Sequence, residues 1–199
     1  MNKLKVGILA STRGTNLQAL IDDIKIDDSK YEIACVISDV YDAGALEKAR
    51  DAKLPSVFVD PTSKTREEYD TKLVSVLDRY EVELVCLIGF MRILSPVFVR
   101  SFENRIMNVH PSLIPAFCGA GYHGDKVHED VLADGCKVSG MTIHLVDEGV
   151  DTGEIICQKT CEVSKRDTVS TLKAKVQQLE KEWYPKIVRQ YANKRTFLE

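Results

Sequence analysis

Short apolar runs alternate with longer amphipathic stretches along the first half of the chain. The apolar runs occupy residues 5–10, 31–38, 55–60 and 83–90. Because they are apolar at nearly every position, they are typical of parallel strands buried on both faces. Between them, apolar residues recur at helical spacing over residues 15–25, 43–53 and 63–80. Repetition of strand and helix predicts right-handed crossover units in a parallel sheet.

The second half departs from this alternation. Strands are predicted over residues 104–111, 138–147 and 154–163, with no long helical stretch between the last two. This spacing favours antiparallel pairing at one edge of the sheet. Residues 164–194 are charged, with apolar positions at helical spacing, and predict a long helix that packs back on the sheet. The predicted fold is α/β: a Rossmann-like, mostly parallel open sheet flanked by helices, with a mixed or antiparallel C-terminal part.

Length and charge narrow the function classes. A chain of 199 residues suits a single domain, residues 1–199, and no linker rich in Pro, Gly or Ser divides it. The net charge is −3 and the basic residues are scattered, which argues against nucleic acid and favours small-molecule substrates. No apolar run reaches the ~18 residues of a membrane span. We therefore expect a cytoplasmic protein that does not associate with membranes.

Candidate ligand sites follow the strands, because a parallel sheet binds ligands at the carboxyl ends of its strands. After the first strand comes "ASTRGTNLQAL", in which Gly14 permits a tight turn and Thr15 and Asn16 are expected to cap the next helix. A helix N-terminus suits phosphate, although a capped helix without a ligand is an equal interpretation. After the fourth strand, Arg92 interrupts the apolar "GFMRILSP". It suits a planar, partly anionic ligand or, alternatively, only extends from a turn to water.

The stretch "MNVHPSLIP" places polar groups at a strand end. Asn108 and His110 alternate with Val109 and so project from one face, where they either converge on one ligand atom or simply cap a turn. A glycine-rich loop over residues 115–129 follows and is expected to wrap or gate a ligand. Further on comes the acidic turn "VDEGVDTGEII". It either holds a carboxylate beside an imidazole, which would raise the pKa of the imidazole, or faces solvent.

Metal binding and covalent catalysis have weaker support. His110, Cys118, His123 and His128 fall in one region but lack the paired spacing of zinc ligands, so no metal site is predicted. No nucleophile elbow surrounds Ser112. The six cysteines are scattered without C-x-x-C spacing, and we interpret them as small buried hydrophobic residues.

Taken together, the motifs resemble the folate-dependent formyltransferase family essentially from end to end. The motifs are "ASTRGTNLQAL", "GFMRILSP", "MNVHPSLIPAFCG", "GMTIHLVDEGVDTGEII" and "VQQLEKEWYP". The turn "RGTNLQAL" and the chain length are similar to the members that act on glycinamide ribonucleotide. The resemblance implies transfer of the formyl group of 10-formyltetrahydrofolate, a co-substrate, to the amine of glycinamide ribonucleotide. It also implies a tetrahedral intermediate, a place in purine biosynthesis and no metal.

The resemblance further implies roles for particular residues. The catalytic set is Asn108, His110 and Asp147. Asn108 and protonated His110 would stabilise the oxyanion, while Asp147 would keep His110 charged and accept the amine proton. The ribonucleotide set is Gly14, Thr15, Asn16, Gln177 and Glu180. The folate set is Arg66, Met91, Arg92, Ile93 and Leu94, together with Asn108.

The resemblance also divides the domain and leaves alternatives open. Residues 1–100 would form a phosphate-binding half and residues 101–199 a catalytic and folate-binding half. A monomer and a homodimer are both compatible with the sequence. The alternative functions are hydrolysis of 10-formyltetrahydrofolate, which would use the same oxyanion donors for water, and a non-catalytic folate- or nucleotide-binding module.

Overall fold

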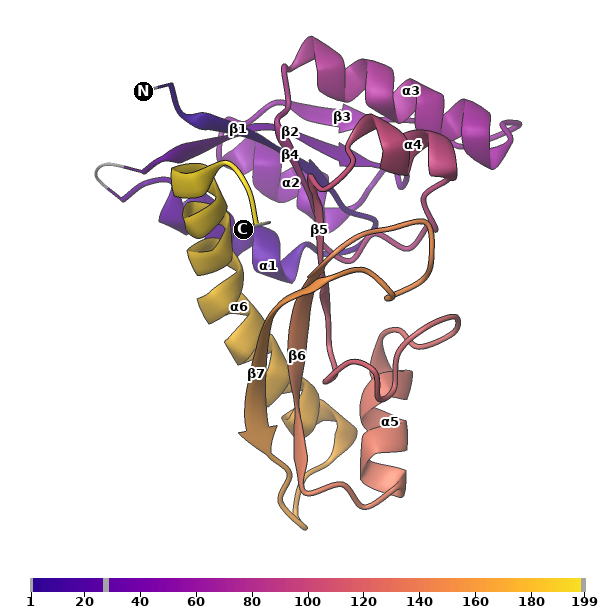
Figure 1. The fold of residues 1–199 in the computed structure, drawn as a ribbon, viewed down its shortest axis with the longest axis vertical. Coiled ribbons are helices and arrows are strands. Elements are labelled where there is room, and N and C mark those ends of the chain that lie inside the picture. The colour runs from indigo at the N-terminus through magenta and orange to yellow at the C-terminus, as the bar shows by residue number, and fades with distance from the viewer. Residues whose placement is uncertain (1, 27–28, 198–199) are drawn as a thin grey trace.

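One seven-stranded sheet runs through the molecule (Figure 1). The computed structural model describes residues 2–26 and 29–197. The strand order is β3-β2-β1-β4-β5-β6-β7. The bounds are β1 Leu4–Leu9, β2 Tyr31–Ser38, β3 Ser56–Phe58, β4 Leu84–Leu87, β5 Ile106–His110, β6 Val138–Leu145 and β7 Ile155–Glu162. Strands β1 to β5 pair in parallel, and β6 and β7 pair antiparallel. The predicted fold class is confirmed.

Helices cover both faces of the sheet. Their bounds are α1 Thr15–Asp23, α2 Gly44–Asp51, α3 Arg66–Arg79, α4 Pro96–Ser101, α5 Asp125–Ala133 and α6 Val169–Lys194. Buried residues of α1, α2, α5 and α6 form one apolar cluster with the sheet, and those of α3 and α4 form a second cluster on its other face. The sheet is therefore the middle layer of three, and its strands are buried because both faces are covered.

The strand order places a crevice beside β1. The chain moves outward from β1 through β2 to β3 and then returns to β4 on the other side of β1. Loops that leave β1 and β4 consequently diverge to opposite faces of the sheet, which opens a ligand crevice at their carboxyl ends. The backbone N–H of Ser11 donates to the carbonyl of Gly89 over 3.1 Å, so the two loops touch at the base of this crevice.

The long C-terminal helix forms one wall of the crevice. A capping box of Thr168 and Thr171 begins α6, which runs beneath β6 and β7. The hydroxyl of Tyr184 lies 3.1 Å from the carbonyl of Leu87 and 3.0 Å from that of Met107. Because these carbonyls belong to β4 and β5, one buried side chain of α6 ties the helix to the strands that carry the site.

Two helices, α4 and α5, were not predicted. The predicted loop over residues 115–129 ends at Gly124, and α5 begins at Asp125. The reason is that Val127, His128 and Val131 lie on one buried face of α5, which packs against α6. The short helix α4 begins at a proline, which suits a first helical turn.

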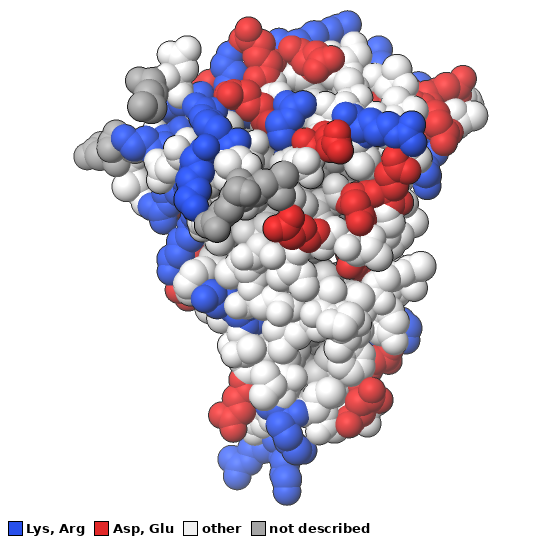
Figure 2. All heavy atoms as spheres, viewed as in Figure 1, with Lys and Arg blue, Asp and Glu red and all other residues white. Residues whose placement is uncertain are grey.

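Surface features are mixed. On the face shown in Figure 2, basic and acidic side chains intermingle over the upper part of the molecule instead of gathering by sign. Cys35 and Cys86 are buried as predicted, whereas the other four cysteines are half-buried. Within residues 2–26 and 29–197, no helix combines the length and the apolar character needed to cross a membrane.

Candidate active site

A cavity of about 1080 Å³ lies at the carboxyl edge of the sheet, beside β1, β4 and β5. Ligand pockets measure roughly 300–1000 Å³, so this cavity is as large as the upper end of that range. The first turn of α1 and one face of α6 line one end. The loop after β4 and the turn between β6 and β7 line the other end, and β5 lies between them.

The middle of the cavity is built on β5 and β6. Asn108 and His110 both line the cavity, as expected from their alternation along β5. In the antiparallel register, Asn108 lies opposite His144 and His110 opposite Thr142. Nδ2 of Asn108 lies 3.2 Å from Nε2 of His144. Strand pairing therefore adds a second histidine, His144, to the amide of Asn108 and the imidazole of His110 that the sequence predicted there.

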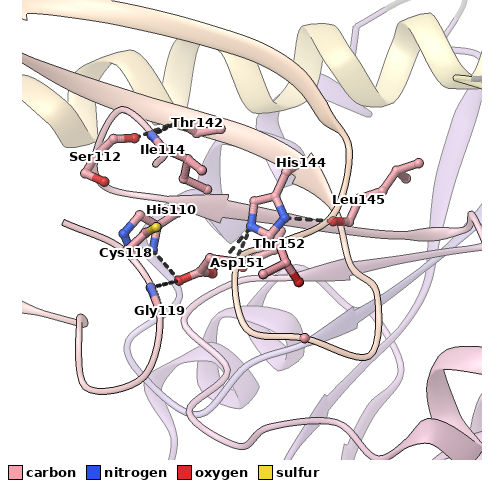
Figure 3. Close-up of polar contacts among 12 residues, drawn as sticks. His110, Ser112, Ile114, Cys118, Gly119, Thr142, His144, Leu145, Asp151 and Thr152 are labelled. Carbon is pink, nitrogen blue, oxygen red and sulfur yellow. Dashed lines mark hydrogen bonds and ion pairs between the residues drawn. The ribbon is translucent and has the colours of Figure 1, made fainter. Parts of the chain in front are cut away.

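Asp151 joins the two histidines (Figure 3). Its Oδ2 lies 3.3 Å from Nδ1 of His110, and its Oδ1 lies 3.6 Å from Nε2 of His144. The backbone N–H of Gly119 donates to Oδ2 over 2.9 Å. Burial acts to raise the pKa of Asp151, but the contacts with His144, Gly119 and His110 outweigh burial and hold that pKa below its ordinary value. An ionised carboxylate therefore lies between two imidazoles.

The prediction that Asp147 lies beside His110 is wrong. Asp147 is exposed, and its Oδ1 accepts hydrogen bonds from the backbone N–H of Gly149 at 3.0 Å and from the hydroxyl of Thr152 at 2.6 Å. These bonds close the turn on itself. Asp151, four residues later in the same turn, has a positive φ of 58° and points back under β5 and β6. The backbone path of the turn decides which carboxylate meets the imidazole.

His110 faces an acceptor with each ring nitrogen. Nε2 lies 2.9 Å from the carbonyl of Phe117, and Nδ1 faces Asp151. A neutral imidazole has one N–H and can donate to only one of them. Burial nevertheless lowers the pKa of His110, and the opposing effects of Phe117 and Asp151 do not reverse it. The carboxylate beside the imidazole does act to raise this pKa, as that alternative for the acidic turn implied, but removing the ring from water outweighs its effect.

The end of the cavity at α1 begins at Gly14. Gly14 is the N-cap of α1 with a φ of +61°, and a Cβ there would lie 2.9 Å from Cβ of Ala45. No side chain caps the helix, which corrects the prediction that Thr15 and Asn16 would do so. Backbone N–H groups of the first turn are consequently left for an anion.

Basic side chains surround this helix end. Nζ of Lys48, from α2, donates to the carbonyls of Arg13 at 2.7 Å and of Gly14 at 3.1 Å. Burial, and then repulsion from Lys181 and Arg13, lower the pKa of Lys48. Within the part of the chain that the structure describes, none of these cations forms an ion pair with an acid. The α1 N-terminus therefore carries unneutralised positive charge.

A buried polar pair connects α1 with α6. Nδ2 of Asn16 donates to Oε2 of Glu180 over 2.8 Å. Burial raises the pKa of Glu180 to about 7. Oδ1 of Asn16 is buried and has no hydrogen-bond partner among the described residues. Gln177 lines the cavity one helical turn before Glu180. These groups, all in the predicted ribonucleotide set, offer acceptors to hydroxyl groups of a ligand.

The end of the cavity at the loop after β4, which holds residues of the predicted folate set, is mainly apolar. Met91 and Ile93 are exposed and Leu94 is buried, and all three line the cavity. The guanidinium carbon of Arg92 lies 4.7 Å from the ring centroid of Tyr69, so a cation–π contact orients Arg92 from α3. Arg66, at the start of α3, is exposed and is not among the described residues that line the cavity. The structure thus brings together the predicted folate residues except Arg66.

Comparisons with known proteins identify the family and agree with the fold. Residues 4–188 match the formyl transferase family. The chain belongs to the formyl transferase family. It is 35% identical to a phosphoribosylglycinamide formyltransferase of Bacillus subtilis, over 94% of this chain and 93% of that protein. A glycinamide ribonucleotide transformylase of Symbiobacterium toebii has the same fold, with a TM-score of 0.91, 39% identity, and coverage of 97% of this chain and 89% of that one.

Longer members of the formyl transferase family also match. The chain is 43% identical to the trifunctional purine biosynthetic protein adenosine-3 of Gallus gallus, over 92% of this chain. It spans 18% of the length of that relative.

The remaining histidines of this formyl transferase domain lie on the loop and α5. His123 is exposed and His128 is buried, and both line the cavity. Burial lowers the pKa of His128 to about 4. Among the residues that the structure describes, no three His, Cys, Asp or Glu side chains are grouped as metal ligands would be.

Four candidate residues of the site are missing from the predicted sets: Asp151, His144, Lys48 and Tyr69. His144 belongs to an apolar strand, and only the register of that strand against β5 shows that it lies opposite Asn108. Lys48 and Tyr69 lie in amphipathic helices, where the sequence does not distinguish a side chain that lines the cavity, such as Lys48, or one that contacts a lining residue, as Tyr69 contacts Arg92, from any other. A polar residue within an apolar strand was the one available signal, and it applied to His144 alone.

Proposed function

We propose that the protein transfers the formyl group of 10-formyltetrahydrofolate to the amine of glycinamide ribonucleotide, in purine biosynthesis. The products are N-formylglycinamide ribonucleotide and tetrahydrofolate. One observation carries the proposal: a single cavity connects an unneutralised helix N-terminus, the Asn108, His110 and Asp151 cluster, and an apolar end with one oriented guanidinium. The names of the relatives that match along most of their length support the same reaction.

The ribonucleotide fits the end of the cavity at α1. Its phosphate would bind the free N–H groups after Gly14, within the positive field of Lys48 and Arg13. Its ribose hydroxyls would donate to the carboxylate of Glu180 and to the unpartnered Oδ1 of Asn16. This placement directs the glycinamide amine toward β5.

The folate co-substrate fits the opposite end. Its pteridine ring would lie against the apolar loop after β4, and the turn after β6 would close over it. Arg92 would pair with a carboxylate of the glutamate part, because its guanidinium is oriented by Tyr69 and has no acidic partner among the described residues. The formyl group would then lie beside Asn108, between the two ends.

The reaction follows from these positions. The amine nitrogen attacks the formyl carbon and forms the new C–N bond, and the formyl oxygen gains negative charge. The amide N–H of Asn108 and the Nε2–H of His110 stabilise that oxygen, once Nε2 exchanges the carbonyl of Phe117 for it. Burial lowers the pKa of His110 in the free protein, and the developing negative charge favours the imidazolium form in the transition state. Asp151 balances the imidazolium and accepts the proton that the amine releases. The bond to N10 then breaks, and N10 takes up that proton, so that no net proton is consumed.

Several expectations stay predictions under this proposal. They are the division of labour between residues 1–100 and 101–199, the cytoplasmic location, the absence of nucleic-acid partners and of a catalytic metal, and a monomeric or homodimeric state.

A steady-state assay with and without the amine substrate tests the proposal. We expect formation of tetrahydrofolate to require glycinamide ribonucleotide and to match formylated product one to one. Full-rate loss of formyl to water without the amine would instead indicate a hydrolase. Binding of both ligands without turnover would indicate a non-catalytic module.

A further inference from the structure

His144 is a buried histidine of the site to which the proposed reaction gives no role. Its side chain is 2% exposed, and both of its ring nitrogens have neighbours of known chemistry. We propose that His144 is a positioning residue that acts in the neutral form with its proton on Nδ1, and that it orients the amide of Asn108 toward the formyl oxygen. This inference rests on the proposed formyl transfer.

The carbonyl of Leu145 fixes the tautomer. Nδ1 of His144 lies 2.7 Å from this backbone oxygen. A carbonyl oxygen only accepts hydrogen bonds, so Nδ1 must carry a proton. In a neutral ring Nε2 is then bare and can only accept. The argument uses one backbone atom and does not depend on how the Asn108 amide is turned.

The bare Nε2 in turn fixes the amide of Asn108. Nε2 lies 3.2 Å from the terminal group of Asn108, in which nitrogen donates and oxygen accepts. Only the nitrogen can face a bare Nε2 favourably. One N–H of Asn108 is then bound by His144, and the second N–H of the same nitrogen is left for the cavity, where Asn108 is a lining residue.

Asp151 is the competing partner of His144. Its Oδ1 lies 3.6 Å from Nε2, whereas the Asn108 nitrogen lies 3.2 Å from it, so Asn108 is the nearer partner. The contact with His144 lowers the pKa of Asp151 only when Nε2 carries a proton, and in the neutral form the Gly119 N–H and His110 are the contacts that keep Asp151 ionised. A proton on Nε2 would reverse this preference, since Nε2 would then donate to Asp151 and Asn108 would turn its oxygen toward the ring. The neutral form therefore keeps Asn108 as a donor and leaves the charge of Asp151 to His110, 3.3 Å away.

The tautomer can be tested without any turnover. In the full chain labelled with ¹⁵N in histidine, the His144 resonances are assigned by their loss in His144→Gln. We expect one protonated and one bare nitrogen, with the proton on Nδ1, at the pH of the activity assay. A proton on Nε2, alone or in an imidazolium, would overturn the inference whether or not the protein transfers formyl groups.

Kinetics test the route through Asn108. Leu at position 144 offers no acceptor, whereas Gln offers a side-chain oxygen that can accept from Asn108. We expect His144→Leu to lower kcat about 100-fold, as for the loss of one oxyanion donor, with each KM within about threefold. The decrease in log kcat for His144→Gln is expected to be less than a third of the decrease for His144→Leu. Equal losses in the two variants would contradict the acceptor role.

A double-mutant cycle separates Asn108 from Asp151 as the group through which His144 acts. In the Asn108→Ala background, His144→Leu is expected to lower kcat by no more than about twofold further. In the Asp151→Asn background it is expected to lower kcat substantially. The opposite pattern would assign His144 to Asp151 and overturn the inference, while leaving the proposed formyl transfer intact.

Discussion

The middle of the cavity and its ribonucleotide end are built on opposite principles. Around Asp151, acid and imidazole groups lie within 3.3–3.6 Å of each other, and the histidine side chains are 2–5% exposed. Around the N-terminus of α1, Lys48 and Arg13 have no acidic partner among the described residues, and Arg13 is exposed. The first region is a buried network whose contacts depend on protonation and geometry. The second is an exposed region of positive charge that suits an anion.

This difference separates two kinds of sensitivity. A buried network is weakly screened by salt, so changes in it should alter kcat at any ionic strength. An exposed positive field is screened over about 10 Å at 0.1 M salt, so changes in it should alter the KM of a phosphorylated substrate and depend on salt. Variants of each region therefore test whether the two regions differ in this way.

The largest effect is expected in the catalytic network. Asn108→Ala and His110→Ala each remove one proposed oxyanion donor and should lower kcat about 100- to 1000-fold. Steady-state assays should show each KM within a few-fold of wild type, because both groups act mainly on the transition state. A raised KM with unchanged kcat would place these residues in binding instead.

A smaller effect is expected at the positive field. Lys48→Gln removes a charge but keeps a donor for the turn carbonyls, and should raise KM for glycinamide ribonucleotide about 20-fold at low salt. The difference from wild type should shrink as salt increases. Lys72→Ala, an exposed lysine of α3 that does not line the cavity, is the charge-matched control and should leave KM unchanged. A salt-independent effect of Lys48→Gln would contradict the electrostatic account.

The buried carboxyl of α6 predicts a pH effect on binding. Burial raises the pKa of Glu180 to about 7, so Glu180 is ionised at pH 8 and protonated at pH 6. Because ribose hydroxyls donate to the ionised form, KM for the ribonucleotide should rise about 10-fold from pH 8 to pH 6. Glu180→Gln should retain only the smaller change caused by the phosphate itself. An unaltered pH profile in this variant would remove Glu180 from the ribonucleotide site.

The smallest effect is expected at the folate end. Tyr69→Leu removes the ring beneath Arg92 and should raise KM for 10-formyltetrahydrofolate about threefold, the size of an exposed cation–π contact. Tyr69→Phe keeps the ring and removes a buried hydroxyl that has no hydrogen-bond partner among the described residues, so KM should stay at the wild-type value. Equal KM values for the two variants would mean that Tyr69 does not orient Arg92.

The sequence predicted the fold better than the site. Buried parallel strands and amphipathic helices carry their periodicity in the local sequence, so β1 to β4 and α1 to α3 were found within a few residues. The helix α5 was missed because its charged residues follow a glycine-rich loop, and only packing against α6 reveals its buried face.

From local pattern alone, the middle of the site could be predicted only where one strand carried the information. Asn108 and His110 alternate on β5, and their shared face follows from sequence. The choice between Asp147 and Asp151 does not, because both belong to one acidic turn and the backbone path of the turn decides which side chain points inward. His144 depends on the register of two strands far apart in the sequence, which no local pattern specifies.

The central claim is that the proposed chemistry depends on the carboxylate held between two histidines. A side-by-side measurement of kcat for Asp151→Asn and Asp147→Asn tests it most directly, since both changes remove one charge from the same turn. We predict a loss of at least about 100-fold for Asp151→Asn and less than about threefold for Asp147→Asn. A larger loss for Asp147→Asn, or equal losses, would contradict the account.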